Sequence, residues 1–470
     1  MGRPTRGKQV KRIDFNALSM IEPNAAGIDI GGTSHWVAVP SDRDERPVRE
    51  FAAFTSGLHE IADWLRRCRV TTVAMESTGV YWIPLYELLE SRKIRVCLVN
   101  ARHVKNVPGR KSDILDCQWL QKLHSYGLLR ASFRPDAEFV KLRTYLRHRQ
   151  MLMQSATAHV QHMQKALVLM NVQLPVVVTD ITGVTGMRII RDIVAGNHDP
   201  VALARHRDKR CAASREKIAE ALRGEYRDEH VFVLRQALEL YDRYQQSLAE
   251  CDLAVEKLLA HLREVMPRVD LPALPAPKKN RARNSSKRAK EFLPDVREAL
   301  HCITVGVDLT ATAGLGDLTA LQLLAEVGTD MSPWPTAKHF ASWATLAPSC
   351  RITGGKRHKS YRPGSTHRVA DILRLAAVNS GRSHTALGAF HRRMSLRIGS
   401  AKAVVATAAK LARIIYTMLK TKTQFNDPGV NTYEARYHHR VVRNLKRRAA
   451  ELGYDLVPTP PVLDDGAAAS

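Results

Sequence analysis

The hydrophobic positions of the first quarter of the chain alternate between the short period of strands and the longer period of helices. Apolar runs bounded by turn residues predict five strands, at residues 25–30, 36–40, 48–54, 70–75 and 94–99. Apolar residues at helical spacing predict helices at residues 58–68 and 79–92. The stretch 55–57, Thr-Ser-Gly, breaks the third strand and is expected to cap the first helix. The stretch 111–116 is expected to open a further helix.

The order of these elements is typical of a ribonuclease-H-like (RuvC-like) fold, in which helices flank a mixed sheet.

Two long helical stretches follow, at 137–171 and 229–262, and Pro175 ends the first. Between them we expect a turn at 183–186 and a short helix at 189–194. The second long stretch has near-heptad spacing and could pair with its neighbour in the chain or with another subunit. The fold class is therefore α/β followed by a coiled-coil connector and a mainly helical C-terminal region.

Prolines followed by a run of Lys and Arg mark a boundary between domains, because such a composition favours a linker. The chain accordingly divides into six segments: a basic arm (1–23), an α/β domain (24–135), a helical connector (136–266), the linker (267–291), a C-terminal domain (292–425) and a basic helix with a disordered tail (426–470).

The formal net charge of +26 indicates a polyanionic partner, most simply nucleic acid. No apolar run approaches the roughly 20 residues of a membrane span, and no apolar signal core is found near the N-terminus. We therefore expect a cytoplasmic, nucleoid-associated protein of bacterial type, with no membrane partner. The seven cysteines are scattered singly, which favours reduced thiols over a disulfide framework or a zinc site.

Four acidic residues are the candidate catalytic and metal-binding groups. Asp113 and Asp116 are three residues apart and share a helix face, Asp29 lies inside an apolar strand, and Glu76 ends another strand. Four converging carboxylates are tolerable only with divalent cations, and Mg²⁺ prefers oxygen ligands. Two Mg²⁺ ions about 4 Å apart can activate an attacking oxygen and stabilise the leaving oxygen in phosphodiester displacement.

Each of these signals also has a simpler interpretation. Asp113 and Asp116 could form an ordinary acidic first turn favoured by the helix dipole, and Glu76 could be an ordinary acid at the end of a strand. Asp29 is harder to explain in this way, because an acid between Ile28 and Ile30 is costly without a partner. The stretch 27–33 also matches the phosphate loop of sugar kinases and actin-like ATPases. We rank that alternative lower for two reasons. No second phosphate loop follows in the sequence, and the function of a small-molecule kinase does not require a net charge of +26.

Basic and glycine-rich stretches predict contacts with nucleic acid. The first is the loop before Asp113, with Arg102, His103, Lys105, Arg110 and Lys111. The second is the turn of Gly314 and Gly316, which resembles a helix-hairpin-helix grip on a phosphate backbone, although an ordinary helix junction is as good an interpretation. The third is the stretch 346–359, which carries Ser349, Thr353, Gly354, Gly355, Lys356, Arg357 and Lys359.

A hydroxyl in the third stretch could attack a phosphodiester, because nearby cations stabilise the alkoxide and the charge of the transition state. The alternative is a loop that only binds phosphate, in which Ser349 and Thr353 donate hydrogen bonds.

The chain resembles transposases of the insertion-sequence "one-ten" family, which includes the "eleven-eleven" group. The matching motifs lie in the family's order at 27–30, 75–82, 100–116, 182–186 and 354–356. The resemblance implies a bridge-RNA-guided recombinase with a RuvC-like domain, in which Asp29, Glu76, Asp113 and Asp116 form a DEDD metal tetrad. It also implies a C-terminal transposase domain, partnership with element and target DNA and with a bridge RNA, and a dimer or tetramer.

One position departs from the family, whose nucleophilic serine precedes the glycine of the C-terminal loop. Here that position is Thr353, which keeps the hydroxyl but adds a methyl group that restricts χ1. We favour Thr353 as the nucleophile, with Ser349 as the alternative. The predicted function is excision and insertion of a mobile element by Mg²⁺-dependent DNA strand transfer. The alternatives are a metal-dependent junction-resolving nuclease and a nucleic-acid-binding protein without catalysis.

Overall fold

A computed structural model describes residues 19–77, 79–100, 113–265, 271–274, 296–348, 352–353, 356–357 and 367–457 of the chain. The chain divides into two compact units, residues 1–134 and 135–470. The predicted linker lies outside the described residues except for 271–274. The finer division into six segments remains a prediction.

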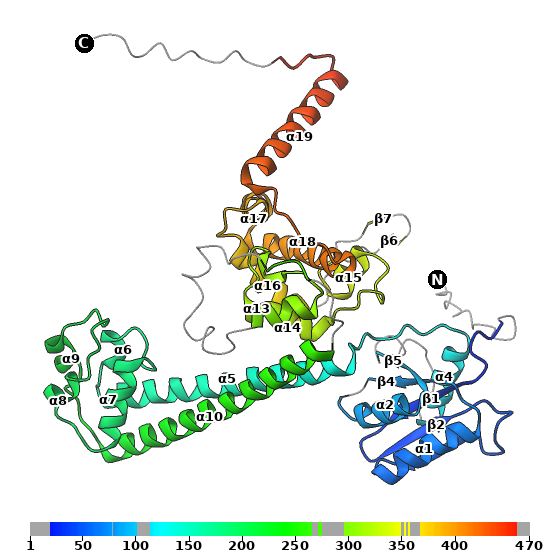
Figure 1. The fold of residues 1–470 in the computed structure, drawn as a ribbon, viewed down its shortest axis with the longest axis horizontal. Coiled ribbons are helices and arrows are strands. Elements are labelled where there is room, and N and C mark those ends of the chain that lie inside the picture. Colours follow the sequence, from blue (N-terminus) through cyan, green and yellow to red (C-terminus); the bar gives the residue numbers. More distant parts are fainter. Residues whose placement is uncertain are drawn as a thin grey trace, which may run out of the picture. The chain divides into compact units, whose positions relative to one another are not determined.

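The first unit is a mixed five-stranded sheet with helices on both faces (Figure 1). Its elements are β1 (Ala25–Ile30), β2 (Ser34–Ala38), β3 (Val48–Ala52), α1 (Thr55–Arg67), β4 (Thr72–Glu76), α2 (Trp82–Ser91), β5 (Arg95–Val99) and α4 (Asp113–Ser125). The strand order is β3-β2-β1-β4-β5, in which β1, β4 and β5 are parallel and β2 and β3 are antiparallel to their neighbours. The predicted fold class is thereby confirmed.

The main core of this unit lies between one face of the sheet and the helices α1 and α2. Ile28 of β1 and Met75 of β4 are buried there against Ile61 and Leu85 of the two helices. A smaller cluster on the opposite face joins Ala74 to residues of β5 and α4. Helix α4 therefore covers the face of the sheet that α1 and α2 leave open.

The predicted cap of α1 is wrong. The helix begins at Thr55, the capping residue is Phe54, and no side chain caps the first turn. The reason is a close approach of the helix to β3: a Cβ atom on Gly57 would lie 2.1 Å from the carbonyl oxygen of Ala52. The stretch 55–57 thus serves the packing of the first helical turn against the strand.

The second unit begins with two long antiparallel helices, α5 (Ala137–Leu169) and α10 (Asp228–Val265), which pack side by side (Figure 1). Arg149 of α5 pairs with Asp252 of α10 at 2.6 Å, and His159 stacks on Tyr244, so the second long helix pairs with its neighbour in the chain. A small helical lobe with its own core joins their far ends. Its helices are α6 (Leu174–Val177), α7 (Val184–Val194), α8 (Pro200–Ala204) and α9 (Arg215–Ala221).

Helix α7 begins earlier than the sequence pattern predicts, because residues 184–186 form its first turn instead of a free turn. A Cβ atom on Gly186 would lie 2.2 Å from the carbonyl oxygen of Ile181, so glycine is needed where the helix packs against the turn before it.

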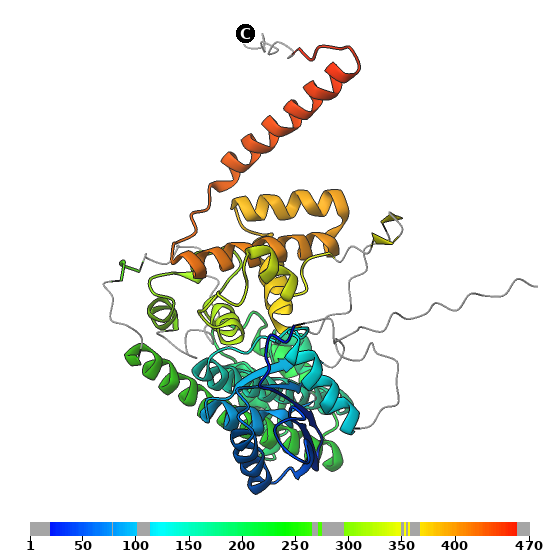
Figure 2. The same ribbon diagram turned by 90° about the vertical axis from the view of Figure 1, so that its right-hand side faces the viewer.

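The rest of the unit is mainly helical, as predicted. Its elements are α13 (Val296–Ile303), the 3-10 turn η2 (Leu309–Ala311), α14 (Asp317–Val327), α15 (Ala337–Trp343), β6 (Ile352–Thr353), β7 (Lys356–Arg357), α16 (Arg368–Ser380), α17 (Ala386–Ile398), α18 (Ser400–Thr421) and α19 (Gly429–Glu451). Figure 2 shows α19 projecting away from α17 and α18. Among the described residues, no helix has the length and apolar character required to cross a bilayer.

Candidate active site

The sheet register aligns Asp29 with Glu76. In the parallel pair of β1 and β4, Ile28 is opposite Met75, and both side chains are buried on the face of α1 and α2. Because side chains alternate along a strand, the next residues, Asp29 and Glu76, point to the other face. Neighbouring strands lie about 4.8 Å apart, so the two partly exposed acids flank one point on the sheet.

Helix α4 packs closely on this same face because Gly27 of β1 has no side chain there. A Cβ atom on Gly27 would lie 2.2 Å from the carbonyl oxygen of Cys117 and 2.3 Å from the backbone nitrogen of Gln121. Gly27 has the same orientation as Asp29, two residues further along the strand. The close contact between helix and strand therefore places the start of α4 beside Asp29.

The thiol of Cys117 lies near two of the candidate carboxylates. Its side chain is fully buried, and burial, followed by the negative charge of Asp29 and more weakly that of Asp116, raises the pKa of the thiol to about 12. Asp29 of the strand and Asp116 of the helix therefore both lie near this thiol. Asp116 itself is exposed.

The donor chemistry of these residues fits a hard divalent cation. Asp29, Glu76 and Asp116 offer only carboxylate oxygens, the ligands that a hard divalent cation prefers. Asp113 opens α4, but its side chain lies outside the described part of the structure. Among the described residues, no group of three or more potential ligands is close enough to hold a metal ion.

Trp36 is a candidate site residue that the sequence pattern did not single out. In the antiparallel pair of β1 and β2 it lies directly opposite Asp29, so the partly exposed indole and the carboxylate share one face of the sheet. An aromatic ring at this position offers a stacking surface for a base. Trp36 could have been found from the sequence only through its pairing with Asp29 across the short β1–β2 hairpin. That pairing can be predicted only when the register of the two strands is known.

Gly314 has a packing role in the second unit. It has a φ of +90°, and a Cβ atom there would lie 2.0 Å from the carbonyl oxygen of Ala376 in α16. Gly316 caps the start of α14 and faces open space. The binding of nucleic acid by these two glycines remains a prediction.

Thr353 ends the short strand β6 and is paired with Lys356 of β7, so the two strands form a hairpin. The side chains of Thr353, Lys356 and Arg357 are not among the described ones. The flanks of the longer segment around the hairpin are close together, because Trp343 packs edge to face on His367 with ring centroids 4.6 Å apart.

Several predicted site residues lie outside the described part of the chain: Arg102, His103, Lys105, Arg110, Lys111, Ser349, Gly354, Gly355 and Lys359. Their roles remain predictions.

A five-stranded mixed sheet with acidic residues on the face covered by α4 is typical of a ribonuclease-H-like domain. A family model described as "Transposase" matches residues 26–172, and a second, described as "Transposase IS116/IS110/IS902 family", matches residues 308–392. Over these two segments the chain matches the IS110 family of transposases. This confirms the family predicted from the sequence motifs.

A curated relative agrees with this family. The chain is 30% identical over 117 residues to the "Insertion element IS110 uncharacterized 43.6 kDa protein" of Streptomyces coelicolor. The alignment covers 24% of this chain and 29% of the relative's length.

Proposed function

We propose that this protein is a metal-dependent DNA transposase that excises and inserts a mobile element under the guidance of a bridge RNA. The observation that carries the proposal is the alignment of Asp29 with Glu76 on the sheet face covered by α4, with Asp116 near the same buried thiol as Asp29. The match to two transposase family models in the expected order supports it.

Asp29, Glu76, Asp113 and Asp116 would hold two Mg²⁺ ions. When bound, such ions supply Lewis-acid stabilisation of the attacking and leaving oxygens. The carboxylates would hold these ions against the sheet, and Trp36 offers a stacking surface beside Asp29. The hydroxyl of Thr353 attacks phosphorus and loses its proton, and the sugar oxygen of the broken strand leaves as a free hydroxyl. The new phosphodiester to the protein conserves the energy of the broken DNA bond for the joining step.

The partners are double-stranded DNA of the element and of its target, and a structured RNA. The formal charge of +26 supports both, because phosphate contacts release counterions. We also propose a dimer or tetramer. Light scattering over a range of protein concentrations measures this directly, and a monomer at every concentration would remove the oligomer from the proposal.

The test of the active site is DNA cleavage with purified protein, Mg²⁺ and RNA transcribed from the flank of the element. Asp29→Asn and Glu76→Gln keep the size of each side chain but remove its charge, so each is expected to lower cleavage on the order of 10²-fold or more. Asp63→Asn is the matched control, because Asp63 lies on α1 and forms an exposed pair with Arg92. Full cleavage by either active-site variant would refute the proposed site.

A further inference from the structure

Helix α19 is anchored at its start and exposed beyond it. Every residue of α19 is described, and none is buried. Asp427 holds the turn before the helix, because its carboxylate accepts hydrogen bonds from the backbone nitrogens of Ala386 at 2.9 Å and Gly429 at 2.8 Å. This ties the start of α19 to the start of α17.

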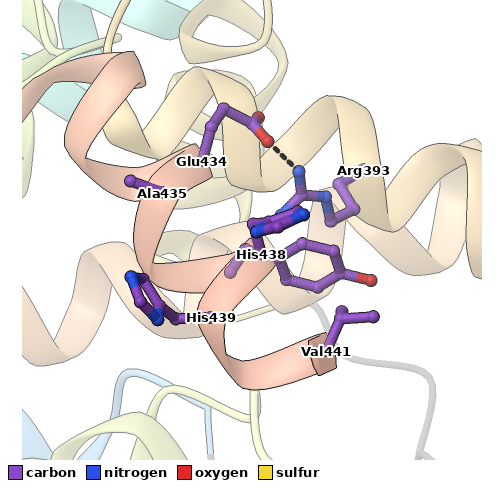
Figure 3. A pocket seen from close by; sticks show the side chains of 7 residues that line it. Arg393, Glu434, Ala435, His438, His439 and Val441 are labelled. Carbon is purple, nitrogen blue, oxygen red and sulfur yellow. Dashed lines mark hydrogen bonds and ion pairs between the residues drawn. The ribbon is translucent and has the colours of Figure 1, made fainter. Parts of the chain in front are cut away.

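Arg393 of α17 forms the second anchor. Its guanidinium pairs with Glu434, as Figure 3 shows, and stacks on Tyr437 with 3.4 Å between the guanidinium carbon and the ring centroid. A surface pocket of about 560 Å³ adjoins this anchor, and Val441 is the last residue of α19 that lines it. The first half of the helix is thus held in a fixed direction, from which the second half projects (Figure 2).

The exposed part of α19 carries an ordered stripe of positive charge. Arg436, Arg440, Arg443 and Arg447 follow at steps of four, three and four residues, which places them within a narrow arc on one side of a helix. At a rise of 1.5 Å per residue the stripe is about 16 Å long. All four side chains are exposed, and Glu451 approaches Arg447 only at 3.7 Å. The stripe therefore keeps most of its positive charge for a partner.

We propose that α19 binds the phosphate backbone of a DNA duplex, with this arginine stripe as the contact surface. The inference deepens the proposed function and rests on it. An α-helix of about 10–12 Å diameter fits the roughly 12 Å wide major groove of B-form DNA. The deep, narrow major groove of A-form RNA does not admit a helix. Residues 429–451 also lie beyond both segments matched by the family models.

A second copy of the chain is a poorer partner for α19. Exposed Leu445 and Leu452 lie on another side of the helix, but Arg448 lies between them and interrupts the apolar stripe. Two such helices would also repel, because α19 holds six Lys or Arg residues against two Glu residues.

The test compares the salt dependence of DNA binding by the full chain and by a variant in which Arg436, Arg440, Arg443 and Arg447 are all replaced by Gln. Glutamine preserves helix propensity. Binding to a 20-base-pair DNA duplex and to an RNA duplex of equal length is measured by fluorescence anisotropy in EDTA, between 50 and 200 mM KCl. The matched control replaces four exposed residues of α10 by Gln: Arg235, Arg243, Lys257 and Arg263.

The slope of log K against log[salt] is negative, and losing four phosphate contacts is expected to reduce its magnitude by about 3.6 in the α19 variant and by less than about 1 in the control. An unchanged slope, an equal loss in the control, or a loss confined to the RNA duplex would overturn the inference. A change of oligomer mass with unchanged DNA binding would assign α19 to a second copy instead.

This outcome is separable from the active-site test. Asp29→Asn is expected to lower cleavage strongly without changing the contribution of α19 to the salt slope. Either proposal can therefore fail while the other stands.

Discussion

At the scale of single residues, the candidate site depends on which neighbours the fold gives to each side chain. Asp29 has Glu76 beside it on the parallel strand β4 and Trp36 beside it on the antiparallel strand β2. Because aligned residues on paired strands share one face, three side chains distant in sequence become a single surface. The function of each can therefore be tested separately.

Trp36→Ala is expected to weaken binding of DNA at the cleavage site by about tenfold, because stacking of one base on an aromatic ring contributes about 1–3 kcal/mol. The measurement is the affinity for a substrate duplex in Ca²⁺ together with the cleavage rate in Mg²⁺. Trp36→Phe retains a ring and is expected to keep most of the affinity. Equal losses in both variants, without a change of melting temperature, would contradict a stacking role.

Asp308 is expected to make the stability of the second unit depend on pH. Its carboxyl is 2% exposed, so burial alone would raise its pKa, but hydrogen bonds from Arg297 and Thr310 outweigh burial and hold the pKa below its ordinary value. A lowered pKa means that the stabilisation is complete above the pKa of the unfolded state and is lost as the pH falls through the lowered value.

Asp308→Asn should therefore destabilise the unit by roughly 3 kcal/mol at pH 7, because Arg297 is left in a partly buried place without its counter-charge. The measurement is urea unfolding of variant and parent between pH 7 and pH 3, and the difference should shrink toward the acid end. The control is Asp371→Asn, since Asp371 forms an exposed pair with Arg374. A difference that stays constant with pH would refute the role of the charge.

At the scale of elements, the position of α4 depends on the absence of a side chain at Gly27. This helix carries Asp113 and Asp116, so its distance from β1 sets the distance between the helix carboxylates and Asp29. Backbone atoms of α4 surround Gly27, and they cannot move aside as the end of a flexible side chain can.

Gly27→Ala is expected to push α4 away from the sheet, which should cost about 1–3 kcal/mol of stability and lower cleavage. Thermal unfolding and the cleavage rate are measured together. Gly32→Ala is the matched control in the next turn, where a Cβ atom would meet only the ring of Tyr81 at 3.8 Å, an ordinary contact. A Gly27→Ala protein with the stability and activity of the control would show that α4 tolerates a wider spacing.

At the scale of the whole molecule, the proposed chemistry uses residues of both units: carboxylates from the first and a hydroxyl from the second. In the proposed chemistry the carboxylates would hold the metal ions that assist strand cleavage, whereas the Thr353 hydroxyl would be the attacking group that becomes joined to the DNA. The two contributions therefore have different signatures in a strand-transfer assay.

Thr353→Ala is expected to abolish both the covalent protein–DNA adduct and joining, and Asp113→Ala is expected to abolish cleavage altogether. Thr353→Ser should retain the adduct, because serine keeps the hydroxyl and frees χ1. Adducts are measured by denaturing electrophoresis of labelled DNA, with Ser349→Ala beside them. Cleavage without an adduct in the parent protein would favour a hydrolytic nuclease, and loss of the adduct only in Ser349→Ala would make Ser349 the nucleophile.

The sequence by itself determined the order of strands and helices and the identity of the acidic residues. Apolar periodicity is a local property, so the strands around Asp29 and Glu76 and the long helices α5 and α10 could be predicted. An acid between two isoleucines is likewise a local signal of a special role. The family motifs combine such local signals in a fixed order, and the family models confirm them.

Only the tertiary structure decided which distant backbones touch and which surfaces remain uncovered. Gly57, in the stretch predicted as a cap, and Gly314, in the predicted phosphate-binding turn, each lie where another segment leaves no room for a Cβ atom. The pairing of Trp36 with Asp29 required the strand register, and the isolation of the arginine stripe on α19 required the packing of α17. These features depend on contacts between segments that are far apart in the chain. Local sequence patterns do not specify such contacts.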